Sequence, residues 1–479
     1  MVGEISQERD LVIIGGGPGG YSAAIRAAQL GLTVTLIEQG QLGGVCLNEG
    51  CIPSKVFTHA ATKHAEKPHL QDLGILESHE EFSIKKLQAY KTKVINRLKS
   101  GIENLCKENK VEIVYGKATF LDVNRIGVEN GHQFDIFTCK NTIIATGSSS
   151  VMPLDLPTTS SRILLAHEIF KLQEIPKDLV VMGNDYIALE VASCYAALGS
   201  NVTVLIDGQV GLPFDESINQ ELLRLLKKRK IRLVNTEKLV SADVTEDRIL
   251  ITVQTDNKKE EIVNGSYLFV SGTRTPNVEA IGINRFGIHQ TNQGFIIVDG
   301  NMESSIKSIY AIGDVTEGPS LAVKAIKQGK AAAEALSGGK PEVDLTFVPT
   351  IVHTIPPIAS VGLSEQDVKA FDIEARTSQF PMRGNGFSAI TGKIDGFLKV
   401  ISDSNTSIIL GIHMIGEGAI ELSSSFVQLL EMAAKEEDIK FPSYAHPSYG
   451  EGLLESVEGL TGQSIHMIPL KKAKKINIT

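Results

Sequence analysis

The sequence is poor in cysteine, has no surplus of positive charge and contains no long apolar stretch. With five cysteines in 479 residues, a disulfide-stabilised scaffold is excluded, and paired cysteines are better explained by chemistry than by structure. The 47 Lys and Arg residues against 56 Asp and Glu residues give a formal charge of −9. This charge argues against a general nucleic-acid-binding protein, because that function needs a basic face.

The best apolar stretch, residues 11–25, has 15 residues including five glycines. It is shorter than the ~20 residues that a membrane-spanning helix needs. The first ten residues carry acidic and basic side chains and do not form the basic-then-apolar pattern of a secretory signal. We therefore expect a cytoplasmic protein without a membrane-spanning segment. Apolar residues (42%) and charged residues (22%) occur at the frequencies of globular proteins, which excludes a disordered or fibrous chain.

Two segments show the pattern of a strand, a glycine-containing turn, a helix and a second strand, which is a βαβ unit. The predicted elements are a strand at 11–14, a helix at 21–30 and a strand at 34–37 in the first unit, and a strand at 179–182, a helix at 186–198 and a strand at 202–206 in the second. The sequence thus predicts an α/β fold with two Rossmann-like dinucleotide-binding domains.

Apolar periodicity predicts further elements outside these units. They are helices at 83–107, 322–336 and 423–434, strands at 111–120, 142–145 and 308–312, and a loop at 147–150. At roughly 100–200 residues per domain, the chain length fits three or four domains. We divide the chain into a first dinucleotide-binding domain at 1–150, a second at 151–276, a central segment at 277–347 and a C-terminal α+β domain at 348–479.

The first glycine-rich turn has the spacing of a dinucleotide-binding motif. Gly15, Gly17 and Gly20 match G-x-G-x-x-G between a predicted strand and a predicted helix. In order, these glycines permit the tight turn, let a diphosphate approach the backbone, and let the helix pack on the strand. The diphosphate then lies at a helix N-terminus, and Glu38, at the end of the next strand, is suited to hold an adenosine ribose. The alternative is a purely structural turn.

The segment GGVCLNEGCIPSK at 43–55 is the most specific in the chain. Residues five apart lie roughly 8.7 Å apart in a regular helix, beyond the about 7 Å that a disulfide spans. Closing Cys46 to Cys51 therefore needs an irregular turn, and Gly50 supplies the backbone freedom. Pro53 suits the first turn of a helix, which places Cys51 at a helix N-terminus, where a thiolate is stabilised. The pair is typical of a redox dithiol; two buried structural cysteines are the alternative.

This segment is similar to the redox-active segment of the flavin-dependent pyridine-nucleotide disulfide oxidoreductases, and it most resembles the members that act on lipoyl groups. The resemblance covers nearly the whole chain. Further matching motifs are IIATG at 143–147, YAIGDV at 310–315, VGLSE at 361–365, GIHMIG at 411–416 and HPSYGE at 446–451.

The resemblance implies that the first domain binds FAD and that the central segment completes the site. The residues implied in FAD binding are Gly15, Gly17, Gly20, Glu38, Lys55, Thr146, Gly147, Asp314 and Ala322. Among them, Asp314 is implied to accept a hydrogen bond from the ribityl chain, and Lys55 to lie by the flavin and pair with Glu190. The resemblance also implies that Cys51 faces the flavin ring while Cys46 exchanges with the substrate.

His446 stands out among 11 histidines because it lies in the HPSYGE motif. A base must take the proton of the attacking thiol, because only a thiolate exchanges with a disulfide. Imidazole titrates in a suitable range, and Glu451 is placed to fix its tautomer and favour the imidazolium. Without the family likeness, a surface histidine would be the default interpretation. The resemblance implies that this histidine comes from the other subunit, so we expect a homodimer joined by the C-terminal domain.

The second glycine turn departs from the dinucleotide-binding motif. Gly183 keeps the first glycine, but Asp185 occupies the second position and Ala188 the third. Alanine is tolerated at the third position. The aspartate adds bulk and negative charge where a diphosphate approaches, and like charges about 4 Å apart repel by roughly 4 kcal/mol at an effective dielectric near 20. If uncompensated, that repulsion weakens binding about a thousandfold.

Other positions depart from the family's pattern as well. They are Ile206, where an acid would bind the NAD ribose, Thr273 in place of a glycine, Val323 in place of a histidine and Pro357 in place of a glutamate. Asp207 follows one place after the expected acid, and adjacent residues of a strand point to opposite faces. The NAD side of the site, with Gly183 and Glu190 as candidates, is therefore doubtful and NAD use stays open.

The leading hypothesis is a homodimeric FAD enzyme that interconverts a dithiol, in the first place a lipoyl group on a carrier protein, with its disulfide and exchanges electrons with NAD. The rival is a disulfide reductase of the same fold that uses NAD(P)H poorly or not at all and takes electrons from another donor. A non-catalytic flavoprotein subunit of a larger complex is the third. Mercuric ion and glutathione are disfavoured as substrates by the tail and the residues flanking the cysteines, and no metal ion is expected.

Overall fold

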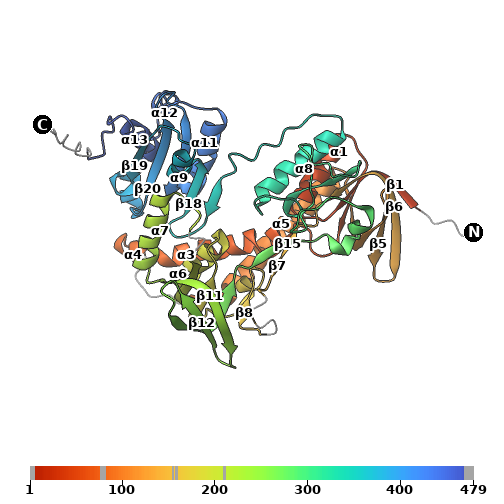
Figure 1. Ribbon diagram of the computed structural model, residues 1–479, viewed down its shortest axis with the longest axis horizontal. Coiled ribbons are helices and arrows are strands. Elements are labelled where there is room, and N and C mark those ends of the chain that lie inside the picture. The colour runs from red at the N-terminus through yellow and green to blue at the C-terminus, as the bar shows by residue number, and fades with distance from the viewer. Residues whose placement is uncertain (1–5, 76–81, 154–155, 157–159, 209–211, 469–479) are drawn as a thin grey trace, which may run out of the picture. The chain divides into compact units, whose positions relative to one another are not determined.

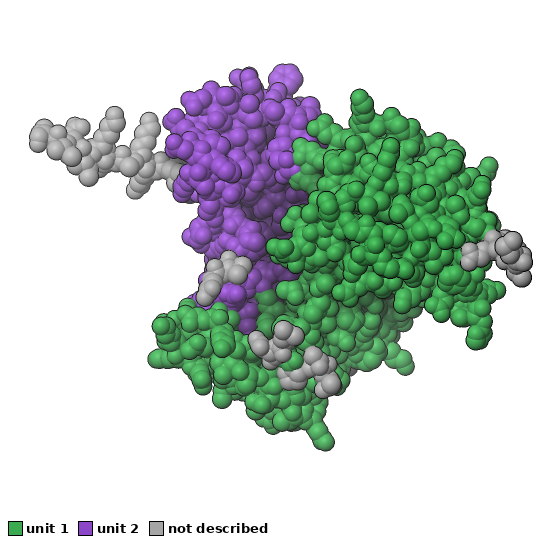
Figure 2. Space-filling model, turned by 45° about the vertical axis from the view of Figure 1, so that its right-hand side comes forward, with its two compact units in different colours: residues 1–61, 79–183, 236–345 green, residues 62–78, 184–235, 346–479 purple. Residues whose placement is uncertain are grey.

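The computed structural model describes residues 6–75, 82–153, 156, 160–208 and 212–468 (Figure 1). The chain divides into two compact units (Figure 2). Unit 1 comprises residues 1–61, 79–183 and 236–345, and unit 2 comprises residues 62–78, 184–235 and 346–479. Among the described residues, no helix is both long enough and apolar enough to cross a membrane.

A mostly parallel sheet forms the core of unit 1. Its strands lie in the order β3 (Glu112–Tyr115), β2 (Val34–Glu38), β1 (Ser6–Ile14), β6 (Gln133–Ile144), β5 (Arg125–Asn130) and β4 (Lys117–Asp122), with β16 (Ile309–Ala311) beside β6. The pairs that β1 makes with β2 and β6 are parallel, whereas β4 and β5 form an antiparallel pair. Residues 11–14 of β1 are all buried, as in a parallel strand that is covered on both faces.

Helices α1 (Pro18–Gln29) and α8 (Ala322–Leu336) pack against each other in unit 1 (Figure 1). Small residues let the two backbones approach closely, since a Cβ at Gly329 of α8 would lie 2.5 Å from Gly19 O of α1. The third long helix, α5 (Ile84–Glu108), begins after Ser83, whose hydroxyl accepts a hydrogen bond from Lys86 N at 3.4 Å. The helices predicted at 21–30, 83–107 and 322–336 are therefore confirmed. Unit 1 also contains α2 (Gly44–Asn48) and most of α3 (Cys51–Ala65), which continues into unit 2.

The segment at 147–150 is not a loop as predicted from its serines. Strand β7 (Ser148–Val151) pairs antiparallel with β15 (Thr273–Pro276), and Ser148 lies opposite Pro276. Serine has a low intrinsic preference for strands, so the strand exists because a distant segment supplies its hydrogen-bonding partner. The prediction of a loop is therefore wrong, and the pairing holds β15 next to Gly147.

The second βαβ unit has the predicted elements in the predicted order. They are β9 (Asp178–Met182), α6 (Tyr186–Ala197) and β10 (Asn201–Asp207). Within unit 1, β14 (Tyr267–Val270) pairs in parallel with β9 and with β8 (Ile163–Leu164). Also in unit 1, β12 (Ile249–Thr255) pairs antiparallel with β13 (Glu260–Gly265) and with the unit 1 part of β11 (Arg232–Val244).

An antiparallel sheet forms the core of unit 2. Its strands lie in the order β17 (Thr350–Val352), β18 (Ile358–Gly362), β21 (Ile409–Ile415), β20 (Phe397–Asp403) and β19 (Ala375–Pro381). Helix α11 (Ala419–Glu431), predicted at 423–434, packs on β18 and β21, and α13 (Glu451–Gly459) packs on β19 and β20. This unit also contains α6 and the helices α4 (Lys67–Asp72), α7 (Glu216–Lys228), α9 (Glu365–Ala370), α10 (Gly386–Thr391) and α12 (Glu436–Lys440).

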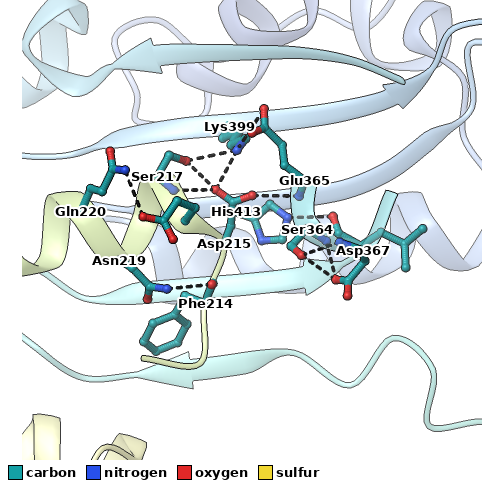
Figure 3. Close-up of polar contacts among 12 residues, drawn as sticks. Phe214, Asp215, Ser217, Asn219, Gln220, Ser364, Glu365, Asp367, Lys399 and His413 are labelled. Atoms are coloured by element: carbon teal, nitrogen blue, oxygen red, sulfur yellow. Dashed lines mark hydrogen bonds and ion pairs between the residues drawn. The ribbon is translucent and has the colours of Figure 1, made fainter. Parts of the chain in front are cut away.

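Unit 2 also contains a buried ion pair between Lys399 on β20 and Asp215, the N-cap residue of α7 (Figure 3). The Nζ–Oδ1 distance is 2.6 Å, and both side chains are fully buried. Ser217 N and Oγ donate to Asp215 Oδ1, and Glu365 N donates to Oδ2 at 3.0 Å. Burial alone would raise the pKa of Asp215, but the hydrogen bonds from Glu365 N, Lys399 and Ser217 lower it to about 2.

Candidate active site

The first glycine turn leaves the N-terminus of α1 without a side-chain cap. Gly15 has φ +106°, and a Cβ there would lie 2.3 Å from Ala145 O. A Cβ at Gly20 would lie 1.8 Å from Gly15 O, so neither position accepts another residue without a shift. Gly17 is the N-cap residue, and a Cβ there would approach only Gly44 Cα, at 4.0 Å. The turn thus offers backbone, rather than a side chain, to an anion.

Glu38 fixes the shape of this turn. Its side chain is buried, and its two carboxylate oxygens accept hydrogen bonds from Gly16 N and Gly40 N, both at 2.7 Å. Each carboxylate oxygen has a second lone pair. The carboxylate therefore holds the backbone of the turn and retains acceptor capacity for a ribose hydroxyl, the role predicted for it. The hydrogen bonds to the turn itself were not predicted.

The two cysteines lie on either side of a tight turn between helices. Cys46 lies in α2, and Cys51 is the first residue of α3, where a helix N-terminus was predicted. Between them, the amides of Glu49 and Gly50 both donate to Val45 O, at 2.9 and 2.7 Å. The irregular turn that the spacing required is thus present. Both side chains are half-buried thiols in this structure.

The two thiols interact directly. A hydrogen bond to the Cys51 side chain is the main cause that raises the pKa of Cys46, followed by burial and by the charge of Cys51. The positive charge of Lys55, one helical turn after Cys51, acts in the opposite direction. A raised pKa means that Cys46 is held in its protonated form, as a donor toward the Cys51 sulfur. The N-terminus of α3 favours a thiolate on Cys51 when the pair is reduced.

Glu190, the predicted partner of Lys55, is buried in α6 within unit 2. Its Oε1 accepts a hydrogen bond from His353 N at 2.9 Å, which ties α6 to the segment after β17. The pairing of Lys55 with Glu190 stays a prediction.

His446 and Glu451 form a pair at the start of α13. His446 Nδ1 lies 2.8 Å from Glu451 Oε1, and Ser448 N donates to Glu451 Oε2 at 2.8 Å. Burial alone would raise the pKa of Glu451, but the hydrogen bonds from His446 and Ser448 lower it overall. The His446 side chain is 81% exposed. Because the carboxylate contacts Nδ1, Nε2 is the ring nitrogen that lies away from Glu451.

Asp314, predicted to contact the ribityl chain, follows β16 and belongs to a polar group in unit 1. Its Oδ2 accepts a hydrogen bond from Ser148 Oγ at 2.9 Å and lies 3.6 Å from Arg274 Nη2. Arg274 Nε also donates to Ser148 Oγ, at 2.8 Å. Nearby, the predicted residue Thr146 donates from Oγ1 to Asn277 O at 2.6 Å. Ala322, also predicted, begins α8.

Sequence reasoning missed Ser148, Arg274 and Asn277 as parts of this region. Asn277 N donates to Gly147 O, so β15 and the residue after it hold both predicted residues of the IIATG motif. From the sequence, only the adjacent Thr273 was considered, as a departure on the NAD side, and not the segment RTPN at 274–277. The structure instead pairs that segment with β7 in unit 1.

The second glycine turn is closed by its own side chains. Gly183 has φ +141°. The next-but-one residue, Asp185, is the N-cap of α6, and its Oδ1 accepts a hydrogen bond from Ala188 N at 2.9 Å. The Asn184 amide accepts from Asp207 N and donates to Asp207 O, at 2.9 and 3.0 Å. These residues do not fit the diphosphate of a pyridine nucleotide, because a carboxylate already lies on the N-terminus of α6.

Models of known families match both parts of the chain. Residues 9–329 match the pyridine nucleotide-disulphide oxidoreductases, and residues 348–457 match the dimerisation domain of the same family. The chain belongs to this family. The resemblance read from the motifs is therefore confirmed, as is the α/β fold with Rossmann-like sheets and a C-terminal antiparallel domain.

Curated relatives in the pyridine nucleotide-disulphide oxidoreductase family match over the full length. The dihydrolipoyl dehydrogenase of Geobacillus stearothermophilus is 38% identical over 98% of this chain and 99% of its own, and that of Bacillus subtilis (strain 168) is 36% identical over 98% and 100%. LpdA from Mycobacterium tuberculosis superposes with a TM-score of 0.87 at 25% identity, covering 95% of this chain and 99% of its own. The HOCl-induced flavoprotein disulfide reductase RclA from Escherichia coli shares the fold, with a TM-score of 0.84 at 23% identity over 94% and 99%.

Family membership indicates which cofactors and which oligomeric state to expect. Pyridine nucleotide-disulphide oxidoreductases use FAD and a pyridine nucleotide, and a dimerisation domain implies a homodimer. The residues of unit 1 fit FAD: the turn at Gly17 has no side chain in the way of a diphosphate, and Glu38 and Asp314 present carboxylates to hydroxyl groups. His446 and Glu451 lie within the part that matches the dimerisation domain.

Proposed function

We propose that this FAD-dependent disulfide oxidoreductase interconverts a protein-bound dihydrolipoyl dithiol and its cyclic disulfide. The observation that carries the proposal is the tight turn that places Cys46 and Cys51 on either side of it, with Cys51 at the start of a helix and one turn before Lys55. Lipoyl groups are favoured as substrates by full-length identities of 36–38% to dihydrolipoyl dehydrogenases.

The exchange begins with Cys46 and Cys51 oxidised. A thiolate of the substrate attacks the Cys46 sulfur, the bond between the two cysteines breaks, and Cys51 leaves as a thiolate. The second substrate thiol then attacks the mixed disulfide, which releases the substrate as its disulfide and leaves Cys46 with a proton. One electron pair thus passes from the substrate to the cysteine pair. The raised pKa of Cys46 matches its protonated end state, and the helix N-terminus suits Cys51 as a leaving thiolate.

His446 is proposed to take the proton of the first substrate thiol. Its Nδ1 is held by Glu451 at 2.8 Å, and the carboxylate stabilises the imidazolium that forms when Nε2 accepts the proton. Such a general base contributes about 10²–10⁴-fold to a rate. In a homodimer, the exposed His446 of one subunit is available to the cysteine pair of the other.

Bound FAD would supply the acceptor for the electron pair of the reduced cysteines. The backbone of the first glycine turn, Glu38, Lys55 and Asp314 are the groups of this chain that we propose to hold it. In this proposal Ser148 and Arg274 orient the Asp314 carboxylate, since both contact its Oδ2 atom.

Anaerobic mixing of the purified flavoprotein with dihydrolipoamide tests this proposal. We expect rapid loss of oxidised-flavin absorbance in the wild type and none in Cys51→Ser, which retains bound yellow flavin. Cys139→Ser is the matched control, because Cys139 is a buried thiol beside Thr142 Oγ1, at 3.2 Å, where a hydroxyl can make the same contact. Full activity of Cys51→Ser, or an equal loss in Cys139→Ser, would contradict the assignment.

A disulfide reductase of the same family that uses pyridine nucleotides poorly is the second candidate. Asp185 favours it, because its carboxylate already accepts the Ala188 amide hydrogen bond at the N-terminus of α6. Stopped-flow mixing with NADH separates the two candidates: flavin reduction at micromolar NADH supports an NAD-linked enzyme, and its absence supports the second.

A further inference from the structure

The two glycine turns of this chain can be compared at the N-cap position, where their backbones are alike and their side chains differ. Gly17 and Asp185 are both the N-cap residue of the helix that follows the turn. Their backbone angles are nearly equal, with φ −70° and ψ −177° at Gly17 and φ −81° and ψ 174° at Asp185. Any residue adopts this extended conformation. The difference between the turns at this position is therefore the side chain alone.

That side chain occupies the part of the helix that an anion needs. Asp185 Oδ1 accepts the hydrogen bond of Ala188 N at 2.9 Å, one of the amides that a helix N-terminus presents to a phosphate. Gly17 makes no such contact in the first turn. A diphosphate arriving at α6 must displace the carboxylate from that amide and then lie close to its negative charge.

The described residues at the end of β10 differ from the expected ribose-binding pattern. Ile206, at the position of the expected ribose-binding acid, is buried at 5% exposure. Asp207 is exposed, but its backbone N and O are both bonded to the Asn184 side chain, which holds the turn against the end of β10. The Asn184 side chain therefore supports the conformation in which Asp185 caps α6.

We propose that Asp185 is a specificity-determining residue that keeps the diphosphate of NAD(H) and NADP(H) off α6. The inference deepens the proposed function, because it concerns the electron partner of the same enzyme. It does not depend on the identity of the dithiol, since the cysteine pair and Asp185 act on different ligands.

Equilibrium binding of ADP-ribose and NAD⁺ to the purified holoprotein tests the proposal without turnover. These probes carry the diphosphate and do not reduce the flavin. By titration calorimetry, we expect Asp185→Gly to bind both probes about a hundredfold to a thousandfold more tightly than the wild type. Asp185→Asn, which loses the charge but keeps a capping oxygen, should fall between them. Glycine at an N-cap costs a helix little stability, so the variant is expected to fold.

Ser83→Gly is the control for loss of a helix cap. Ser83 caps α5 through Lys86 N, and α5 has no predicted nucleotide contact. The affinity of Ser83→Gly for ADP-ribose should equal that of the wild type. If the wild type bound ADP-ribose with an affinity within about threefold of that of Asp185→Gly, the proposal would be overturned. A factor of three is far smaller than the change in affinity that the repulsion of one charge would cause. Equal tightening in Ser83→Gly would overturn it too.

Flavin reduction by dihydrolipoamide, measured on the same variants, separates this inference from the proposed function. We expect the rate to be the same in the wild type and in Asp185→Gly. If dihydrolipoamide reduces neither protein while Asp185→Gly gains affinity for ADP-ribose, the lipoyl assignment fails and the role of Asp185 stands. If dihydrolipoamide reduces both and affinity for ADP-ribose is unchanged, the role of Asp185 fails and the lipoyl assignment stands.

Discussion

The buried pair of Asp215 and Lys399 should be more sensitive to loss of the acid than to loss of the base. Asp215→Asn leaves the ammonium group with Ser217 Oγ at 3.1 Å and Glu365 Oε1 at 3.4 Å (Figure 3). An uncompensated buried charge costs about 3–5 kcal/mol. Because the Glu365 carboxylate offsets part of that cost, we expect a loss of about 3 kcal/mol in the free energy of unfolding.

Lys399→Met should cost less, about 1–2 kcal/mol. The Asp215 carboxylate keeps its hydrogen bonds from Glu365 N and from Ser217 N and Oγ. The double variant, which buries neither charge, should be more stable than Asp215→Asn alone. Lys140→Met is the matched control, because Lys140 forms an ion pair with Asp10 at 2.7 Å while 77% exposed. It should cost less than about 1 kcal/mol.

Urea unfolding of the full chain, followed by circular dichroism, measures these differences. The pKa of Asp215 is lowered from 3.8 to about 2. Its contribution is therefore fully present above the unfolded-state pKa and is lost as the pH falls through the lower value. Because folding lowers this pKa by nearly 2, the ionised carboxylate contributes about 2 kcal/mol to the free energy of unfolding. The gap between the wild type and Asp215→Asn should thus stay constant from about pH 5 to pH 8. Equal losses in Asp215→Asn and Lys399→Met would refute the reasoning.

Two functional variants test the groups around the reactive centres. Glu451→Gln keeps a hydrogen bond to His446 but removes the charge that stabilises the imidazolium. Flavin reduction by dihydrolipoamide, measured by stopped flow, should therefore slow. The decrease should be smaller than the roughly 10²–10⁴-fold that loss of a complete general base causes. The pKa of Glu451 is lowered, so its carboxylate is charged throughout the neutral range. If the rate difference between the wild type and Glu451→Gln disappeared between about pH 6 and 8, the role of this charge would be contradicted. Arg274→Met removes the Nε donor to Ser148 Oγ and the charge beside Asp314. Flavin retention on ultrafiltration should weaken by about tenfold to a hundredfold, and an unchanged affinity would show that Asp314 is oriented without Arg274.

Features set by neighbouring residues could be predicted from the sequence. The turn at Gly15 follows from a local glycine pattern between a strand and a helix, and the start of α3 at Cys51 follows from Pro53 two places later. The contact of His446 with Glu451 is also local, because α13 begins at that glutamate and brings its carboxylate to the preceding loop.

Features that depend on distant partners could not be predicted in the same way. Ser148 lies in a serine run that favours a loop, and only its pairing with Pro276 in β15 makes it part of a strand and a neighbour of Asp314. Likewise, neither Asp215 nor Lys399 has a local pattern that reveals the other, since the first caps α7 and the second lies in β20.

For Asp185, the local sequence pattern identified the position that matters but not the contact that its side chain makes. The sequence indicated a charge where a diphosphate approaches, and aspartate is also among the preferred N-cap residues. The structure shows that the same carboxylate performs the capping, with Oδ1 on Ala188 N, so charge and occupied amide act together. At the first turn, Gly17 leaves the corresponding helix end uncapped with the same backbone angles. Because side chains rather than the fold distinguish the two turns, duplication of the βαβ unit does not by itself imply a second nucleotide, and the affinity of each turn must be measured separately.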